Sequence, residues 1–205
     1  MSITSPSEVE LLPIALPGYD HTVGYFGGPA LPNQSRGFAD YPISKAASAG
    51  DNMNSMTNTK GIFPAIVTPF TAEGQINEPS LRHIIQYSLK KGVDGFYTCG
   101  AGGEGLLMTV AERQRALDIV VEEVNGKAVV IAHVGAFQTP DTLALARHAS
   151  KAGADAVASL PPSYFYGADP LALEEFYRKV AGASEIPVLV YNVGGSVNVT
   201  VDTME

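Results

Sequence analysis

Tryptophan is absent from the sequence, and cysteine occurs once, at Cys99. A single cysteine excludes a disulfide within the chain and is typical of a reducing compartment. No stretch is long and apolar enough to cross a bilayer, and the amino terminus lacks the charged-then-apolar pattern of a signal peptide. We therefore expect a cytoplasmic protein with no membrane partner.

An excess of positive charge is also missing. The chain has 13 Lys and Arg against 21 Asp and Glu, which gives a net charge of −8. This balance argues against nucleic acid or an anionic membrane surface as a partner. His, Cys, Asp and Glu do not cluster at metal-ligand spacing, so the sequence indicates no metal and no cofactor.

Residues 1–57 show no sustained helical or strand periodicity. They are rich in Ser, Asn and Gly and contain Pro13, Pro17, Pro29, Pro32 and Pro42. This composition predicts a disordered or loosely packed extension. Alternatively, Met56 is the true start of the protein, because the regular pattern begins directly after it.

From Gly61 onward, short apolar segments alternate with amphipathic helices. The expected strands are 62–67, 93–99, 128–134, 155–160 and 188–193. The expected helices begin at Asn77, at a Thr109–Glu112 capping box, at Thr139 and at Asp169. Such strand–helix units predict a parallel sheet with helices outside it. Both a doubly wound sheet and a β/α barrel fit this pattern.

A loop of small residues, 100–105, follows the second expected strand. The helix before that strand is expected to end at Gly92 in a left-handed conformation. Because this loop has few side-chain atoms, a ligand can approach its backbone, and its N–H groups can bind an anion. The glycine spacing matches neither a dinucleotide fingerprint nor a P-loop. A tight strand-to-helix turn and an anion site therefore both remain open.

In β/α folds, functional residues gather at the carboxyl ends of strands. Among those here, His133 is expected to be a packed, hydrogen-bonded residue, Cys99 a core residue, and Glu104 a support for the loop or a subunit contact. Tyr191 ends a buried strand, where its phenol needs a polar partner. Because a phenol has an ordinary pKa of about 10, proton transfer by Tyr191 needs a relay or a cationic neighbour.

Five segments, in this order, resemble the dihydrodipicolinate synthase/N-acetylneuraminate lyase family of Schiff-base aldolases. They are Gly61–Phe70, the Gly-Ala-Gly-Gly-Glu loop at 100–104, Ile131–Gly135, Pro162–Phe165 and Val190–Asn192. The resemblance covers residues 58–205 and is nearer to the N-acetylneuraminate lyase branch. It implies an α/β fold, the (β/α)8 TIM barrel, of which 58–205 is the amino-terminal part with about five βα units. It also implies a homo-oligomer, a tetramer in the family.

The resemblance further implies class I chemistry, in which a lysine forms an imine with the pyruvate moiety of a 2-keto acid such as N-acetylneuraminate. Tyr191 would shuttle a proton, Tyr164 would complete a proton relay, and Ala101, Gly102 and Gly103 would bind the carboxylate. Synthesis of 4-hydroxy-tetrahydrodipicolinate and cleavage of a 2-keto-3-deoxy sugar acid are the alternatives within the family.

Departures from the family pattern also bear on function. Ala101 and Gly102 replace the hydroxyl residues usual in the loop, and Ser196 stands where the synthase branch places an arginine. The family lysine belongs to a sixth strand, whereas no lysine here falls at the end of an expected strand. The lysines are Lys45, Lys60, Lys90, Lys91, Lys127, Lys151 and Lys179. We therefore expect this chain alone to form no imine, and a non-catalytic carboxylate-binding or assembly fragment is the alternative of another class.

Overall fold

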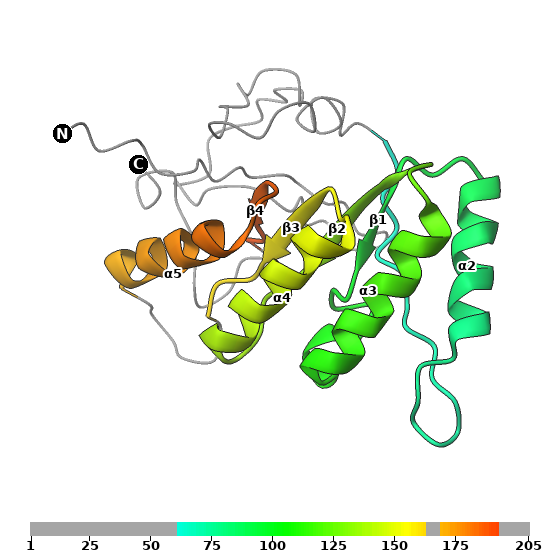
Figure 1. Cartoon of the computed structure of the whole chain (residues 1–205), viewed down its shortest axis with the longest axis horizontal. Helices are drawn as coiled ribbons and strands as arrows, with labels where there is room; N and C mark the ends of the chain where they lie inside the picture. The colour runs from blue at the N-terminus through cyan, green and yellow to red at the C-terminus, as the bar shows by residue number, and fades with distance from the viewer. Residues whose placement is uncertain (1–60, 163–168, 193–205) are drawn as a thin grey trace, which may run out of the picture.

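Parallel strands alternate with helices in the part of the chain that the structure describes, which is residues 61–162 and 169–192 of a computed structural model (Figure 1). The elements are α2 (Glu78–Lys90), β1 (Gly95–Thr98), the short 3-10 turn η2 (Gly105–Leu107), α3 (Val110–Val124), β2 (Val129–His133), α4 (Thr139–Ala152), β3 (Ala156–Ser159), α5 (Pro170–Ala183) and β4 (Val188–Val190). The extension expected at residues 1–57 lies outside the described residues.

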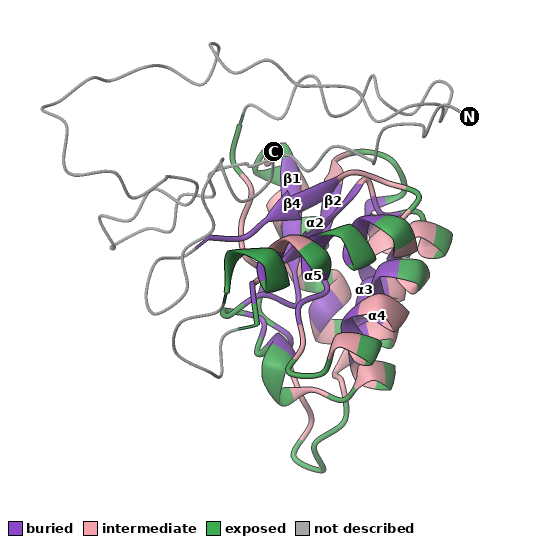
Figure 2. Ribbon diagram, turned by 90° about the vertical axis from the view of Figure 1, so that its left-hand side faces the viewer, coloured by how far each residue is buried: buried purple, intermediate pink, exposed green. Residues whose placement is uncertain are grey.

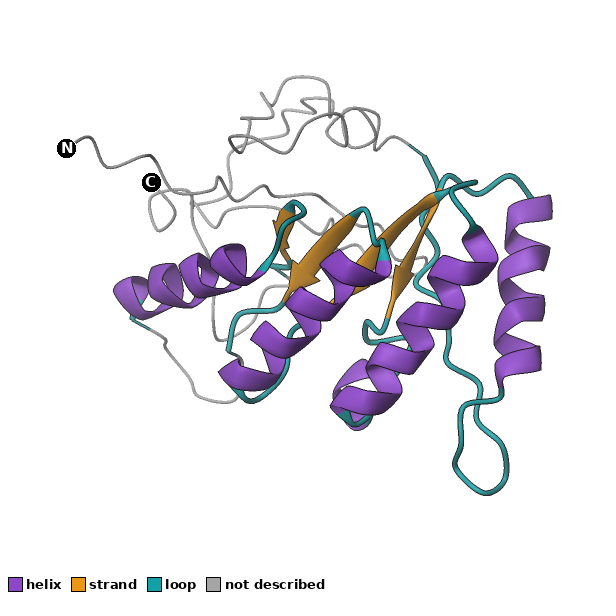
Figure 3. Cartoon of the chain, in the orientation of Figure 1, coloured by secondary structure: helices purple, strands orange, loops and turns teal. Residues whose placement is uncertain are grey.

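The order of the strands decides between the two folds that the sequence allows. The sheet has four strands in the order β1-β2-β3-β4, and all neighbouring pairs are parallel. Successive helices pack on one another and lie on one side of the sheet (Figure 3). A doubly wound sheet would reverse its strand order and carry helices on both faces. The chain therefore has the arrangement of a β/α barrel.

Local capping explains why the helices begin where the sequence predicts. The Asn77 side chain accepts a hydrogen bond from the Ser80 N–H at 3.2 Å, and the Asp169 side chain accepts one from Leu171 N–H at 2.8 Å. Thr109 and Glu112 form the complete capping box at the start of α3. Helix α4 differs, because its cap is Gln138, whose side chain makes no capping bond. Gly92 has a φ of +79°, as expected at the end of α2.

Aspartates at the start of β1 and β3 tie each strand to the one before it. Asp94 Oδ2 accepts a hydrogen bond from the Ile62 N–H at 2.7 Å, and Asp155 Oδ2 accepts one from the Val130 N–H at 2.8 Å. Burial raises the pKa of Asp155, whereas the bond from Val130 opposes that rise. The two carboxylates thus fix the register at the amino ends of the strands, away from the edge that carries the candidate site.

The first expected strand, 62–67, is not a regular strand. It runs beside β1, but only Ala65 forms a bridge, with Tyr97. The Tyr97 N–H donates to the Pro64 carbonyl at 3.0 Å, and the Ile66 N–H donates to the Tyr97 carbonyl at 3.1 Å. Pro64 has no N–H to donate, so the ladder is interrupted there. The prediction of a regular strand at 62–67 was therefore wrong, although the segment lies beside β1 where a strand would lie.

The strands of the sheet are almost entirely buried (Figure 2), and two apolar clusters lie on its two faces. The larger packs strand residues such as Phe96, Val130 and Val157 against the helices. The smaller lies on the opposite, inner face and includes Tyr97, Ile131, Ala156, Ala158, Leu189 and Tyr191. In the described ranges, no helix is long and apolar enough to span a membrane.

Candidate functional site at the strand ends

The loop after β1 turns sharply at each end. Cys99 and Glu104 have φ values of +57° and +56°, a conformation that costs non-glycine residues free energy. Between them the chain folds back on itself so closely that a Cβ on Gly105 would overlap the Cys99 carbonyl oxygen. A Cβ on Gly103 would lie 2.8 Å from the Ile66 carbonyl oxygen. Close packing therefore explains part of the glycine content of the loop.

The N–H groups of the loop divide into two kinds. Gly103 N–H donates to the Gly100 carbonyl at 3.2 Å, and the Gly103 carbonyl accepts from Thr68 Oγ1 at 2.8 Å. Ala101 and Gly102 are exposed, and their N–H groups donate no hydrogen bond within the described part of the chain. Of the three residues predicted to hold a carboxylate, Ala101 and Gly102 can offer N–H groups, whereas Gly103 anchors the loop.

Tyr191 lies just beyond β4 and is buried, with 7% of its surface exposed. Burial raises the pKa of its phenol, which is therefore neutral and able to donate a proton. Its ring centroid is 5.5 Å from that of Tyr97 and 5.8 Å from that of His133. The other predicted catalytic residue, Tyr164, lies outside the described residues.

Arg113 is a site component that the sequence analysis did not single out. Its guanidinium is buried and donates to the carbonyls of Gly135, at 2.9 Å, and His133. It thereby fixes the end of β2 from the helix layer. A signal was present, because Arg113 precedes Leu117, Val120 and Val124 by four, seven and eleven positions and so belongs to the inward face of α3.

His133 connects the loop to Tyr191 at the same edge of the sheet. Its Nδ1 lies 3.0 Å from the Cys99 carbonyl oxygen, where the loop begins, and its ring packs edge-on to Tyr191. Burial, with a smaller contribution from the Arg113 charge, lowers the pKa of His133 to about 3. Burial also raises the pKa of the Cys99 thiol. The expectations of a packed histidine and a core cysteine are confirmed.

The depressed pKa of His133 predicts a stability that falls in acid. The His133 imidazole binds a proton at about pH 6.5 in the unfolded chain, whereas in the folded chain it does so only near pH 3. Between those values the unfolded state binds more protons, so this contribution is complete above about pH 6.5 and is lost as the pH falls toward 3. The expected slope is up to about 1.4 kcal/mol per pH unit, measured by urea unfolding from neutral pH to pH 4.

The control for this prediction is His133→Asn, in which the amide can still donate to the Cys99 carbonyl but does not titrate. Glu78, Glu112 and Glu123 also have lowered pKa values and add acid sensitivity, but they do so equally in both proteins. The variant should therefore show a shallower slope than the parent. Identical slopes would contradict the assignment of a buried neutral imidazole.

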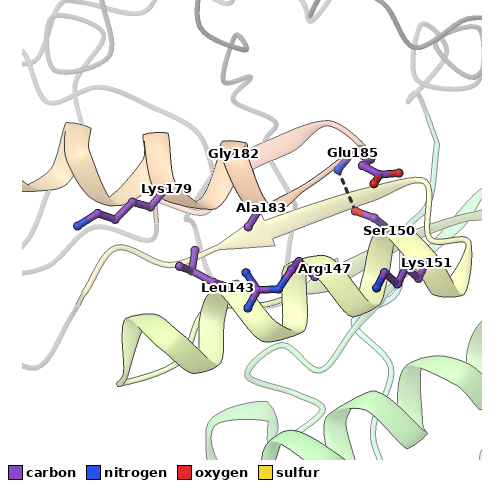
Figure 4. Close-up of a pocket in the computed structure, with 8 residues that line it drawn as sticks. All are labelled: Leu143, Arg147, Ser150, Lys151, Lys179, Gly182, Ala183 and Glu185. Carbon is purple, nitrogen blue, oxygen red and sulfur yellow. Dashed lines mark hydrogen bonds between the residues drawn. The ribbon is translucent and has the colours of Figure 1, made fainter.

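Other features that could form a site lie elsewhere. Every described lysine belongs to a helix or to the turn after one, so none stands at the carboxyl end of a described strand. A hollow of about 470 Å³ lies between α4 and α5, lined by Arg147, Lys151 and Lys179 among others (Figure 4). It opens on the helix layer rather than at the strand ends. Within the described ranges, no three His, Cys, Asp or Glu residues gather as metal ligands.

Together, the strand ends offer N–H donors for an anion and a neutral phenol for proton transfer. This combination suits a small carboxylate bound at the carboxyl edge of a β/α barrel. Residues 58–205 match the Dihydrodipicolinate synthetase family, and the chain belongs to this family. The family comprises pyruvate-dependent lyases. The resemblance carried by the five sequence segments is thereby confirmed.

Individual relatives agree with this assignment. An N-acetylneuraminate lyase of Escherichia coli strain K12 / DH10B is 36% identical over 141 residues, which are 67% of this chain and 46% of the lyase. The chain thus spans about half the length of the curated relatives it matches.

Solved structures give the same fold. YagE, a prophage protein of Escherichia coli K12 solved in complex with pyruvate, is 31% identical with a TM-score of 0.64 over 66% of this chain and 45% of its own. CdNal of Clostridium difficile, solved in complex with mannosamine, is 29% identical with a TM-score of 0.67 over 71% of this chain and 51% of its own.

Proposed function

We propose that this chain provides the pyruvate-binding part of a Schiff-base lyase that cleaves or forms a 2-keto acid such as N-acetylneuraminate. One observation carries the proposal. The loop after β1 presents the N–H groups of Ala101 and Gly102 at the edge of the sheet where the phenol of Tyr191 also lies. His133 contacts the Cys99 carbonyl, where this loop begins, and also the ring of Tyr191. Family membership supports the same chemistry.

In the proposed reaction, the N–H groups of Ala101 and Gly102 donate hydrogen bonds to the pyruvate carboxylate. A lysine amine attacks the keto carbon, and water leaves as the imine forms, which makes that carbon an electron sink for cleavage of the neighbouring carbon–carbon bond. Tyr191 carries the proton between the substrate oxygen and solvent, and Tyr164 assists it. The described lysines all belong to helices or the turns after them, so another segment or chain would supply the amine.

The substrate is proposed to be N-acetylneuraminate in preference to the alternatives. The E. coli relative named above is an N-acetylneuraminate lyase, and Ser196 stands where the synthase branch is expected to have arginine. A cytoplasmic homotetramer is part of the same proposal.

The experiment is borohydride trapping with pyruvate, performed on the protein purified from its own cells. A reduced pyruvate adduct on one lysine, detected by intact mass and located by peptide mapping, is the expected result. Acetate, which has the carboxylate but no keto group, is the matched control and should give no adduct. If pyruvate protects the protein against heat but no adduct forms, the chain is a non-catalytic carboxylate-binding protein instead.

A further inference from the structure

The hollow between α4 and α5 lies on the helix layer, away from the proposed pyruvate site (Figure 4). Its volume of about 470 Å³ is in the range of small-molecule sites, about 300–1,000 Å³. Helix α5 leaves this space open because it presents Gly182 and Ala183 there, and a Cβ on Gly182 would meet no atom within 4 Å. Lys151 and Glu185 line the hollow a few residues before β3 and β4, so it lies toward the amino ends of these strands, whereas Tyr191 follows β4 at the carboxyl end.

Ser150 fixes the two sides of the hollow relative to each other. Its Oγ accepts a hydrogen bond from the Glu185 N–H at 3.0 Å (Figure 4) and donates one to the Ala146 carbonyl at 3.2 Å. Ser184 Oγ lies 3.5 Å from Ser150 Oγ and donates to the Ile186 carbonyl at 2.7 Å. The hollow is therefore part of the packed structure and not a gap between independent helices.

Two cations of the hollow lack the partners that other surface cations have. Arg82, Arg115 and Arg178 each pair with a glutamate. Arg147 and Lys151 are exposed, and their side chains form no ion pair or hydrogen bond with any described residue. They stand four positions apart on α4, where two like charges are neighbours and repel each other. An anion bound between them would remove that repulsion.

Lys179 adds a third positive charge, from α5. It pairs with Glu175 at 2.6 Å, but the two side chains are 53% and 67% exposed, and ion pairs so exposed contribute little. On its flexible stem the ammonium group can turn onto a ligand instead. Glu185 is the acidic residue of the lining, and its carboxylate pairs with no cation in the described chain. Three positive charges and one negative charge give the lining a net charge of +2, although the chain as a whole carries −8.

We propose that the hollow between α4 and α5 binds the phosphoryl group of a small molecule, held by Arg147, Lys151 and Lys179. A phosphate monoester carries a charge of about −1.5 to −2 at neutral pH and so matches the charge of the lining, whereas a monocarboxylate such as pyruvate would neutralise only half of it. The guanidinium can donate two parallel hydrogen bonds to phosphate oxygens. The rest of the molecule lies on Leu143 and Ala183, the apolar part of the lining. This site is separate from the loop after β1, and the inference does not depend on the lyase reaction.

The test measures the melting temperature of the full-length protein at rising ligand concentration, at constant ionic strength and in a buffer without phosphate. Glucose 6-phosphate and inorganic phosphate should each raise the melting temperature, whereas glucose, which lacks the phosphoryl group, should not. Tighter binding of glucose 6-phosphate would identify an ester as the ligand, and equal binding would identify free phosphate. Arg147→Gln and Lys151→Gln should each weaken binding about 10-fold.

Arg178→Gln is the matched control. Arg178 is next to Lys179 in α5 and pairs with Glu174 at 2.7 Å, but it does not line the hollow. Its substitution removes the same charge, and binding should stay within about twofold because salt screens exposed charges over about 10 Å. Without ligand, the melting temperature of Arg147→Gln should not fall, because this substitution removes a repulsion with Lys151 rather than a contact.

Saturating pyruvate distinguishes this site from the proposed pyruvate site, since the affinity for phosphate should be the same with and without it. Competition between the two anions would place the phosphate at the loop after β1 and overturn the proposal. Variants Arg147→Gln and Lys151→Gln that bind as tightly as Arg178→Gln would overturn it too, as would a parent protein that responds no more to glucose 6-phosphate than to glucose. Failure of the lyase proposal is a different result, the absence of a trapped pyruvate adduct.

Discussion

Tyr191→Phe is expected to reduce 2-keto acid turnover by about 100-fold or more while the protein still forms its adduct with pyruvate. The substitution removes only the hydroxyl and keeps the ring, so the contacts to Tyr97 and His133 remain. Imine formation requires the carboxylate site and the amine, whereas cleavage also needs a proton carrier at the end of β4. The measurement pairs steady-state cleavage with borohydride trapping on the same preparation.

Tyr177→Phe is the matched control for this prediction. Tyr177 is as deeply buried, but it lies in α5, and its hydroxyl donates to the Ser159 carbonyl at 3.0 Å. Its loss should cost about 1 kcal/mol of unfolding free energy and leave turnover per folded molecule unchanged. If Tyr191→Phe retains full turnover, or loses pyruvate trapping together with turnover, the role assigned to its phenol is wrong.

Gly105→Ala is expected to destabilise the protein by about 3 kcal/mol or more. A Cβ at this position would overlap the Cys99 carbonyl oxygen, and that oxygen is held in place by its contact with His133 Nδ1. The collision is with backbone rather than with a flexible side chain, so the loop and the end of β1 must both move. Urea unfolding measures the loss, and the affinity for pyruvate should fall with it.

Gly182→Ala serves as the matched glycine control. Gly182 lies in α5, and a Cβ there meets no atom within 4 Å. Since alanine loses less backbone freedom on folding, this change should stabilise the protein by about 0.5–1 kcal/mol. Equal effects of the two substitutions would show that the loop around Gly105 is looser than its packing indicates.

The sequence predicts most elements of the fold because their signals are local. The caps at Asn77, Thr109 and Asp169 depend on side chains next to the backbone groups they satisfy, and the end of α2 depends on the positive φ of Gly92. The segment 62–67 shows the limit of such reasoning. It has the apolar character of a strand, but Pro64 withholds a donor from the ladder and leaves a single bridge.

The candidate site is less predictable, because its contacts join residues far apart in sequence. The interaction of His133 with Cys99, and the packing of both Tyr97 and His133 on Tyr191, depend on the order of the strands, which periodicity does not give. Arg113 shows a different limit. A charged residue in a helix is usually taken as solvated, and only its register with Leu117 and Val120 marks it as inward-facing.

The central claim, that the strand ends hold pyruvate, is tested most directly by a crystal structure of the protein purified from its own cells after reduction with borohydride in pyruvate. The expected structure has the pyruvate carboxylate within hydrogen-bond distance of the N–H groups of Ala101 and Gly102, and the Tyr191 hydroxyl facing the reduced carbon. A pyruvate group bound elsewhere, such as the cationic hollow between α4 and α5, or none bound at all, would contradict the account.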